Sequence, residues 1–174
     1  MLPLISDIQA SSGLVIFEDA YLVDQDLSNM EFFDADFMRA HGNNINFENS
    51  KFNDTNFSNA NFFNLNMKDT DLYNVRFNDS ELNSVVFSGT SIENTYINNT
   101  KFVFSQFRNS NISNSNFHDV EFEHSDFSNA QISSTYFISS NLKGADFSGA
   151  KLENVTFELS SYFGKSDLSN SNFS

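Results

Sequence analysis

The chain has 174 residues and a net charge of −14 at pH 7. It contains no cysteine, which excludes a disulfide framework and thiolate chemistry. No apolar run reaches the roughly 18 residues that a transmembrane helix needs, and the negative charge disfavours direct binding to nucleic acid or to an anionic membrane.

We expect residues 1–14 to form an N-terminal cap or tail, because they lie outside the repeat pattern. They lack the basic start and the long apolar core of a secretory signal, so we expect a cytoplasmic protein, with a secreted effector as the alternative. The apolar residues of this segment could cover the hydrophobic end of the structure that follows; they are Leu2, Leu4, Ile5 and Ile8. The alternative for the segment is a targeting or secretion signal.

A five-residue period runs from Phe17 to Phe157. Stepping by five gives 29 positions, here called centres, of which 28 carry Phe, Leu, Ile or Met. At the position two before the centre, 25 of 29 are Ala, Ser, Thr or Val. At the position two after it, 22 of 29 are Asn, Asp or Gly. Neither a helix of period 3.6 nor a strand of period 2 produces these columns, so the chain is a repeat protein.

This pattern resembles the pentapeptide-repeat family, whose loose motif is A(D/N)LXX, here centred on Phe. The resemblance covers residues 15–174 and implies one all-β domain, a right-handed, four-sided parallel β-helix with four pentapeptides per coil. The centre and the small residue would point inward, and the Asn, Asp and Gly column would form the corners. At about 4.8 Å per coil, roughly eight coils make a rod on the order of 38 Å long.

Several asparagines fall at these predicted corners. We expect their side chains to stack as ladders between coils, since such ladders stabilise stacked strands. Examples are Asn94, Asn99, Asn109 and Asn114.

The first coil, from Phe17 to Asp36, carries seven acidic residues and no Lys or Arg. One interpretation is a solvated surface that keeps the solenoid soluble. The other is an electrostatic docking site for a basic partner. The spacing does not match a calcium-binding loop. The candidate docking residues are Glu18, Asp19, Asp24, Asp26, Glu31, Asp34 and Asp36.

Gly42 is the centre that carries no large side chain. The period resumes at Phe47 without an insertion, so a core side chain is missing. This predicts a local cavity or a bulge, with His41 or another neighbour folded into the space.

Four aromatic residues at outward positions are candidate anchors for a protein partner. With four pentapeptides per coil, Phe33 and Tyr73 lie on one side of the rod, two coils apart. Phe63 shares another side with Val103, and Phe104 follows Val103 directly.

His118 and His124 lie close in sequence to Glu121 and Glu123, and such residues can bind metal ions. Their side chains would project from two different sides of the coil, however. We therefore expect no metal site, and nothing in the sequence points to a cofactor.

The period slips by one residue near 159–164, because Leu168 and Phe173 follow Phe163 rather than Tyr162. An uncovered last coil would present an edge open to another chain. We therefore expect a homodimer through the C-terminal coils, formed by Tyr162, Phe163, Leu168 and Phe173, which the resemblance also implies. The alternative is a longer natural chain.

Catalysis has no basis in this sequence, which lacks a phosphate-binding glycine loop and a convergent nucleophile and base. A protein-binding solenoid is the leading interpretation. The resemblance adds a second, a DNA mimic of the quinolone-resistance or immunity type that binds DNA gyrase or another DNA-binding protein. The chain departs from the gyrase-protecting members because it lacks their interrupting loops and C-terminal helix. The further alternatives are a bacterial effector and a structural spacer.

Overall fold

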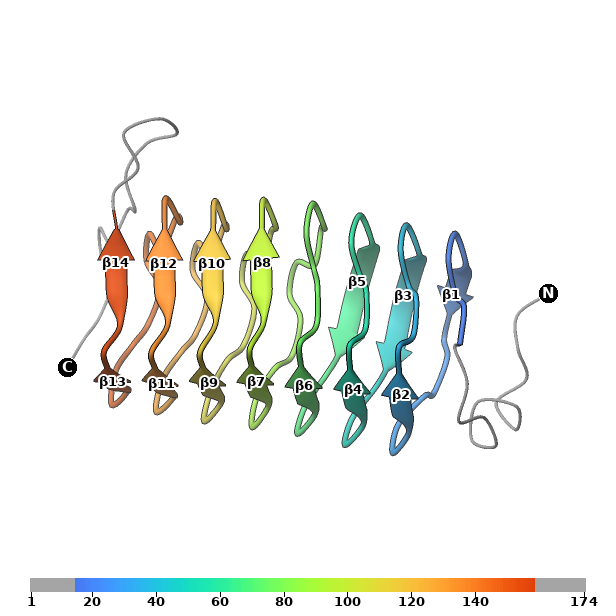
Figure 1. The fold of residues 1–174 in the computed structure, drawn as a ribbon, viewed down its shortest axis with the longest axis horizontal. Helices are drawn as coiled ribbons and strands as arrows, with labels where there is room; N and C mark the ends of the chain where they lie inside the picture. Colours follow the sequence, from blue (N-terminus) through green and yellow to red (C-terminus); the bar gives the residue numbers. More distant parts are fainter. Residues whose placement is uncertain (1–14, 159–174) are drawn as a thin grey trace.

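A computed structural model describes residues 15–158. These residues form a rod of about seven stacked coils in which every paired strand is parallel to its neighbour (Figure 1). The predicted four-sided β-helix is confirmed; the prediction of roughly eight coils counted the chain to residue 174. The described residues contain no helix of the length and apolar character that a membrane span requires.

Each coil takes four pentapeptides, as the register of the strands shows. Leu22 pairs with Gly42, Phe32 with Phe52, and Phe117 with Phe137. We number the four sides in chain order as side 1 (15–19), side 2 (20–24), side 3 (25–29) and side 4 (30–34), each with its equivalents in later coils.

The strands are short and lie mainly on three of the sides. Side 1 carries β8 (Tyr96–Asn98), β10 (Asn116–His118), β12 (Tyr136–Ile138) and β14 (Thr156–Glu158). Side 2 carries β1 (Tyr21–Val23), β3 (His41–Asn46) and β5 (Asn61–Asn66), the last two of which continue onto side 3. Side 4 carries β2 (Glu31–Phe33), β4 (Lys51–Asn53), β6 (Asp71–Tyr73), β7 (Ser91–Glu93), β9 (Asn111–Ser113), β11 (Gln131–Ser133) and β13 (Lys151–Glu153).

The predicted corner positions adopt left-handed backbone angles. Between residues 19 and 154, every fifth residue has a positive φ, from 48° at Ser134 to 73° at Gly89. Asn, Asp and Gly dominate this column because they tolerate that region best. The corners fix the coil at four sides, so the residues between two corners alternate outward and inward.

Stacked phenylalanine rings fill the interior. Phe17, Phe37, Phe57 and Phe77 form one column along the rod, with ring centroids 4.6 to 5.0 Å apart. A second column, from Phe87 to Phe147, has spacings of 4.6 to 4.8 Å. Offset-stacked rings add about 0.5–1.5 kcal/mol per pair to the free energy gained by burial. The rings therefore couple each coil to the next.

The small inward column carries hydroxyls that satisfy backbone groups. The hydroxyl of Ser50 donates to the carbonyl of Leu27 at 2.9 Å, and that of Ser80 to Phe57 at 2.7 Å. A buried hydroxyl is costly without such a partner. Ser and Thr can therefore replace Ala here while the backbones stay close.

At Gly42, two neighbours fill the missing core position. A Cβ atom built on Gly42 would lie 2.5 Å from Cδ1 of Phe62 and 3.0 Å from Cγ1 of Ile45. The expectation that a neighbour folds into the space therefore holds for Phe62 and Ile45. The side chain of His41 does not fill this space: it points outward and stacks on Tyr21, with ring centroids 5.2 Å apart. A hollow of about 280 Å³ lies over this part of β1, β3 and β5.

Candidate protein-interaction surface

Side 4 presents two aromatic rings to solvent. Phe33 at the end of β2 is 49% exposed, and Tyr73 at the end of β6 is 47% exposed. Asn53 of β4 lies between them, since it pairs in register with Phe33 in the preceding coil and Tyr73 in the following one. By the Phe33–Tyr73 cleft we mean these three residues, in which the smaller side chain of Asn53 stands between two larger rings.

Asn53 differs from the asparagines that form ladders. Asn44 donates to Oδ1 of Asp24 at 2.9 Å, and Asn64 donates to Oδ1 of Asn44 at 3.0 Å. Oδ1 of Asn53 is buried and has no hydrogen-bond partner. A polar atom left this way is unfavourable, and here it results from ring neighbours where a ladder would have polar ones.

Carboxylates flank the cleft. Asp34 follows Phe33 and Asp54 follows Asn53, both at corners. Asp54 accepts a hydrogen bond from Asn74, and Lys51 pairs with Glu31 at 3.5 Å. The local charge around the cleft is negative.

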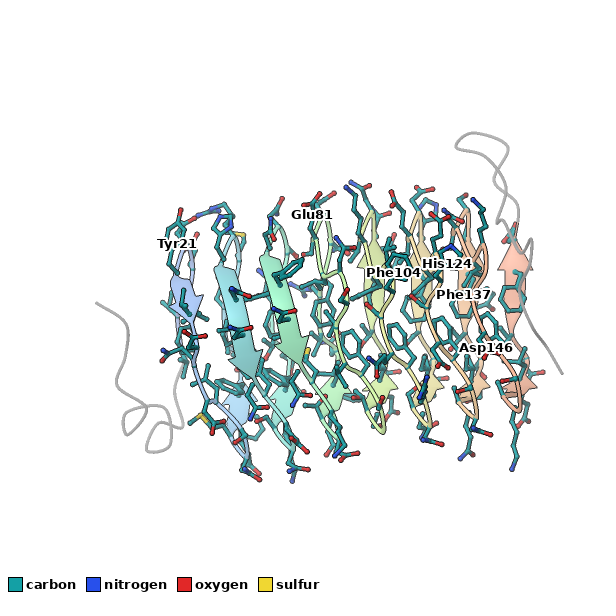
Figure 2. The ribbon with its side chains drawn as sticks, turned by 180° about the vertical axis from the view of Figure 1, so that it is seen from behind. Tyr21, Glu81, Phe104, His124, Phe137 and Asp146 are labelled. Atoms are coloured by element: carbon teal, nitrogen blue, oxygen red, sulfur yellow. The ribbon has the colours of Figure 1, made fainter. Side chains whose placement is uncertain are left out.

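Side 2 carries the other two predicted anchors. Phe63 in β5 is 57% exposed, and Phe104 at a corner is 61% exposed. The ring of Phe104 stacks on His124 with centroids 5.3 Å apart, and Figure 2 shows the two rings at the surface of the rod, while Phe137 lies within it. The φ of Phe104 is +57°, a conformation that is strained for a bulky residue.

The seven acidic residues of the first coil do not form one patch. Glu18, Asp19 and Asp36 lie on side 1, and the others are divided among the remaining three sides. Arg39 of the next coil contacts Glu18 at 2.6 Å and Asp19 at 2.7 Å. The hydrogen bond from Arg39 lowers the pKa of Asp19, and the hydrogen bond to Asp19 raises the pKa of Arg39. Part of the acidic charge is therefore neutralised between coils.

The two histidines lie on different sides of the rod. His118 on side 1 is 3.0 Å from Oδ1 of Asn98 and 2.9 Å from Asp119, whereas His124 stacks on Phe104. Within residues 15–158, no three His, Asp or Glu side chains gather in a group that could hold a metal ion.

The corner ladders occur in part where they are predicted. Asn99 donates to Oδ1 of Asp79 at 2.8 Å, as expected. At all four named corners, the backbone N–H donates to a backbone carbonyl of the next coil: Asn94 to Ser113, Asn99 to His118, Asn109 to Ser128 and Asn114 to Ser133.

The Pentapeptide repeats family model matches residues 43–79, 80–119 and 115–154, as eight copies. The chain belongs to the pentapeptide-repeat family. The match covers more than half of the chain and agrees with the five-residue columns and with the register of four pentapeptides per coil. No curated protein sequence matches the chain.

Solved structures of pentapeptide-repeat proteins are distant from this member of the family. HetL, a protein involved in heterocyst differentiation regulation in the cyanobacterium Nostoc sp. strain PCC 7120, is 12% identical with a TM-score of 0.44. That alignment covers 90% of this chain and 86% of HetL. QnrB1, a plasmid-mediated fluoroquinolone resistance protein, is 18% identical with a TM-score of 0.34, and 91% and 92% of the two chains are covered. A pentapeptide-repeat protein from the Arabidopsis thaliana thylakoid lumen is 18% identical with a TM-score of 0.31, covering 71% and 66%.

Other predicted features lie outside the described residues. These are the N-terminal cap with Leu2, Leu4, Ile5 and Ile8, the period slip near 159–164, and the dimer contact of Tyr162, Phe163, Leu168 and Phe173. They remain predictions.

Asn53 is not among the candidate site residues predicted from the sequence, although its spacing in the sequence indicates its position. Asn53 lies four pentapeptides from both Phe33 and Tyr73, so the coil length alone places it between them. The same signal marks a second cleft on side 1, where Asn116 pairs with Tyr96 and Tyr136. Oδ1 of Asn116 is likewise buried without a partner.

Proposed function

We propose that this chain is a non-catalytic protein-binding solenoid that contacts its partner through outward aromatic side chains. One observation carries the proposal: the four predicted anchors are all between 47% and 61% exposed on a rod whose outward residues are mostly polar. They are Phe33, Phe63, Tyr73 and Phe104.

The scaffold suits this role physically. The rings project from strands and corners that both neighbouring coils hold in place, so little conformational entropy is lost when a partner binds. Aromatic side chains dominate the binding energy of many interfaces. The strained backbone at Phe104 also supports a functional role, because such strain concentrates at functional sites.

The test compares capture of proteins by the intact chain and by variants. The double variant Phe33→Ser/Tyr73→Ser should no longer capture the protein. The intact chain should still capture it at high salt, because apolar contacts are not screened by ions. The control is Tyr96→Ser/Tyr136→Ser, which removes two rings of similar exposure from side 1. If the chain and both variants retain the same proteins, the aromatic contact is refuted.

A DNA mimic that binds DNA gyrase or another DNA-binding protein is the second candidate, and charge supports it. The described residues carry a net charge of −13, which is the chain total without Asp7, Asp167 and Lys165. Over a rod of about 34 Å, this is roughly 0.4 charges per Å, against roughly 0.6 for duplex DNA. Residues 1–87 contain 14 of the 23 acidic residues, so the charge is concentrated towards the N-terminal coils.

The DNA mimic has a separate test in DNA supercoiling by gyrase, with and without a quinolone, at two salt concentrations. Mimicry predicts inhibition or protection that weakens as salt rises. Neutralising the seven first-coil acids should abolish the effect. Absence of any effect at micromolar protein excludes gyrase as the target.

A further inference from the structure

We propose that the Phe33–Tyr73 cleft binds an arginine side chain of the protein partner. The guanidinium group would lie between the two rings, above Asn53. This inference rests on the proposed protein-binding function and names the chemistry that the site would recognise.

The spacing of the cleft fits a planar group. Phe33 and Tyr73 lie two coils apart, which places their backbones about 10 Å from each other. A guanidinium midway between them is about 5 Å from each ring, within the roughly 6 Å over which a cation interacts with an aromatic face. Inside the rod, the centroids of stacked rings in adjacent coils lie 4.6 to 5.6 Å apart. The cleft is thus a ring column from which the middle ring is missing.

Asn53 supplies a hydrogen-bond acceptor at the floor of this cleft. Its Oδ1 atom has no partner, and the terminal torsion of an asparagine turns easily. A turn of the amide presents this oxygen to a donor that enters between the rings. Guanidinium has five N–H donors and no acceptor, so it suits an unpaired carbonyl oxygen.

The surrounding charge selects a cation. Asp34 and Asp54 occupy the corners next to Phe33 and Asn53, and Asp71 and Glu93 lie on the same side in the following coils. Lys51, on the same strand as Asn53, pairs with Glu31 at 3.5 Å, so these charges remain negative in sum. Arginine is favoured over lysine because its planar group stacks on aromatic faces and is less strongly hydrated.

The cleft on side 1 has fewer carboxylates around it, with Asp79 and Asp119 at corners, and serves as an internal control. Tyr96 and Tyr136 flank Asn116 with the same spacing, but Arg76 is the bridge partner of Tyr96 in the preceding coil. Arg76 has no ion-pair partner among the described salt bridges. Its positive charge disfavours a second guanidinium nearby.

The experiment titrates the full chain with two peptides, acetyl-Gly-Arg-Gly-Arg-Gly-amide and its lysine counterpart, and follows side-chain amide signals by NMR. The arginine peptide should shift the Asn53 amide and the rings of Phe33 and Tyr73. The lysine peptide should bind about fivefold to tenfold more weakly. The signal of Asn116 should move little.

Variants make the result specific. Phe33→Leu/Tyr73→Leu keeps apolar side chains in the strands but removes both aromatic faces, so it should abolish the preference for arginine. Tyr96→Leu/Tyr136→Leu should leave it unchanged. Equal binding of the two peptides, or shifts spread evenly over the acidic residues, would overturn the proposal, as would retention of the arginine preference in Phe33→Leu/Tyr73→Leu.

The capture test and the peptide titration together separate this inference from the proposed function. If a partner is captured through Phe33 and Tyr73 but the peptides bind equally, the protein-binding function stands and arginine recognition fails. A partner that inserts an aromatic ring gives this outcome. If the peptides show the arginine preference but no partner depends on the rings, the proposed function fails.

Discussion

The role of each residue follows from its position within five. At an inward position, even a hydroxyl is accommodated, because the carbonyl of an earlier coil accepts its hydrogen bond, as Thr90 shows with Met67 at 2.6 Å. At a corner, the positive φ of the backbone determines which residue types are favourable, and a bulky residue is strained there. A residue that departs from these columns therefore marks either a place where neighbouring side chains fill the core instead or a functional residue.

At Gly42, the side chains of Phe62 and Ile45 replace the missing central side chain. This gives a prediction that is opposite to what the repeat pattern suggests. Gly42→Leu restores the centre, yet it should destabilise the rod by about 1–3 kcal/mol because Phe62 and Ile45 already occupy the space. Urea unfolding measures this change. The double variant Gly42→Leu/Ile45→Ser moves volume back to the centre and should recover part of the loss. A more stable Gly42→Leu would show that the space is empty.

Phe104 combines strain with exposure. Phe104→Asn should stabilise the protein by about 0.5–1 kcal/mol, because asparagine tolerates the φ of +57° far better. This gain in stability is the net expected after the stacking of Phe104 on His124, which is exposed to solvent, has been lost. Thermal unfolding measures it, and Phe63→Asn in β5, which has no positive φ, is the matched control. No gain at residue 104, or an equal gain at residue 63, contradicts the strain argument.

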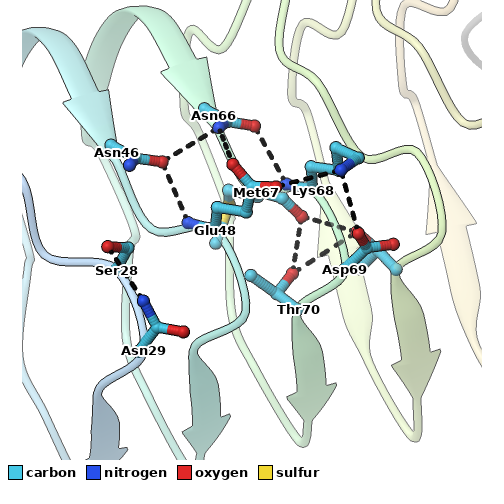
Figure 3. A network of polar contacts seen from close by, with 10 residues as sticks. Ser28, Asn29, Asn46, Glu48, Asn66, Met67, Lys68, Asp69 and Thr70 are labelled. Carbon is cyan, nitrogen blue, oxygen red and sulfur yellow. Dashed lines mark hydrogen bonds and ion pairs between the residues drawn. The ribbon is translucent and has the colours of Figure 1, made fainter.

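At the scale of one coil on the next, polar side chains on side 3 link neighbours. Asn46 donates to Oδ1 of Asp26 at 3.0 Å and accepts from the side chain of Asn66 at 2.9 Å. Lys68 contacts Glu48 at 2.9 Å in the same layer (Figure 3). These side-chain pairs therefore link three successive coils on side 3, and the column ends at Val86, which has no polar side chain.

Asn46→Asp tests this layer through pH. At pH 7 the new carboxylate faces Asp26, so one of the two acquires a raised pKa in the folded state. A raised folded pKa means that the variant regains stability as the pH falls below that value and loses it as the pH rises. We expect a loss of about 1–3 kcal/mol at pH 7 that largely disappears near pH 4.

Asn46→Ala is the control for that experiment. It removes the hydrogen bonds without adding charge, so the difference from the unchanged protein should vary little with pH. Thermal unfolding at the two pH values measures both variants. A loss in Asn46→Asp that is the same at pH 4 and pH 7 would show that the two side chains do not face each other.

At the scale of the whole molecule, the fold could be predicted and much of the candidate surface could not. The columns of centres and corners specify the coil, and the register of four pentapeptides places Phe33 and Tyr73 on one side. The sequence does not show that Phe62 and Ile45 fill the space at Gly42, because this depends on the orientation of the Phe62 ring in the folded chain. Nor does it show the stack of Phe104 on His124. Spacing alone could have identified Asn53, had its neighbours one coil away been compared.

The buried side chains form one continuous interior along the rod, but each coil packs only on its neighbours, so the stability is close to a sum of local terms. Phe87→Ala and Phe107→Ala remove two rings that stack at 4.8 Å in adjacent coils. Their effects on unfolding free energy should be non-additive by at least about 0.5 kcal/mol. Phe37→Ala and Phe147→Ala, in coils about 26 Å apart, should add within about 0.3–0.5 kcal/mol. Urea unfolding of both double-mutant cycles measures whether the coupling is limited to adjacent coils. Coupling of equal size in the distant pair would contradict this and would mean that stability is shared along the entire rod.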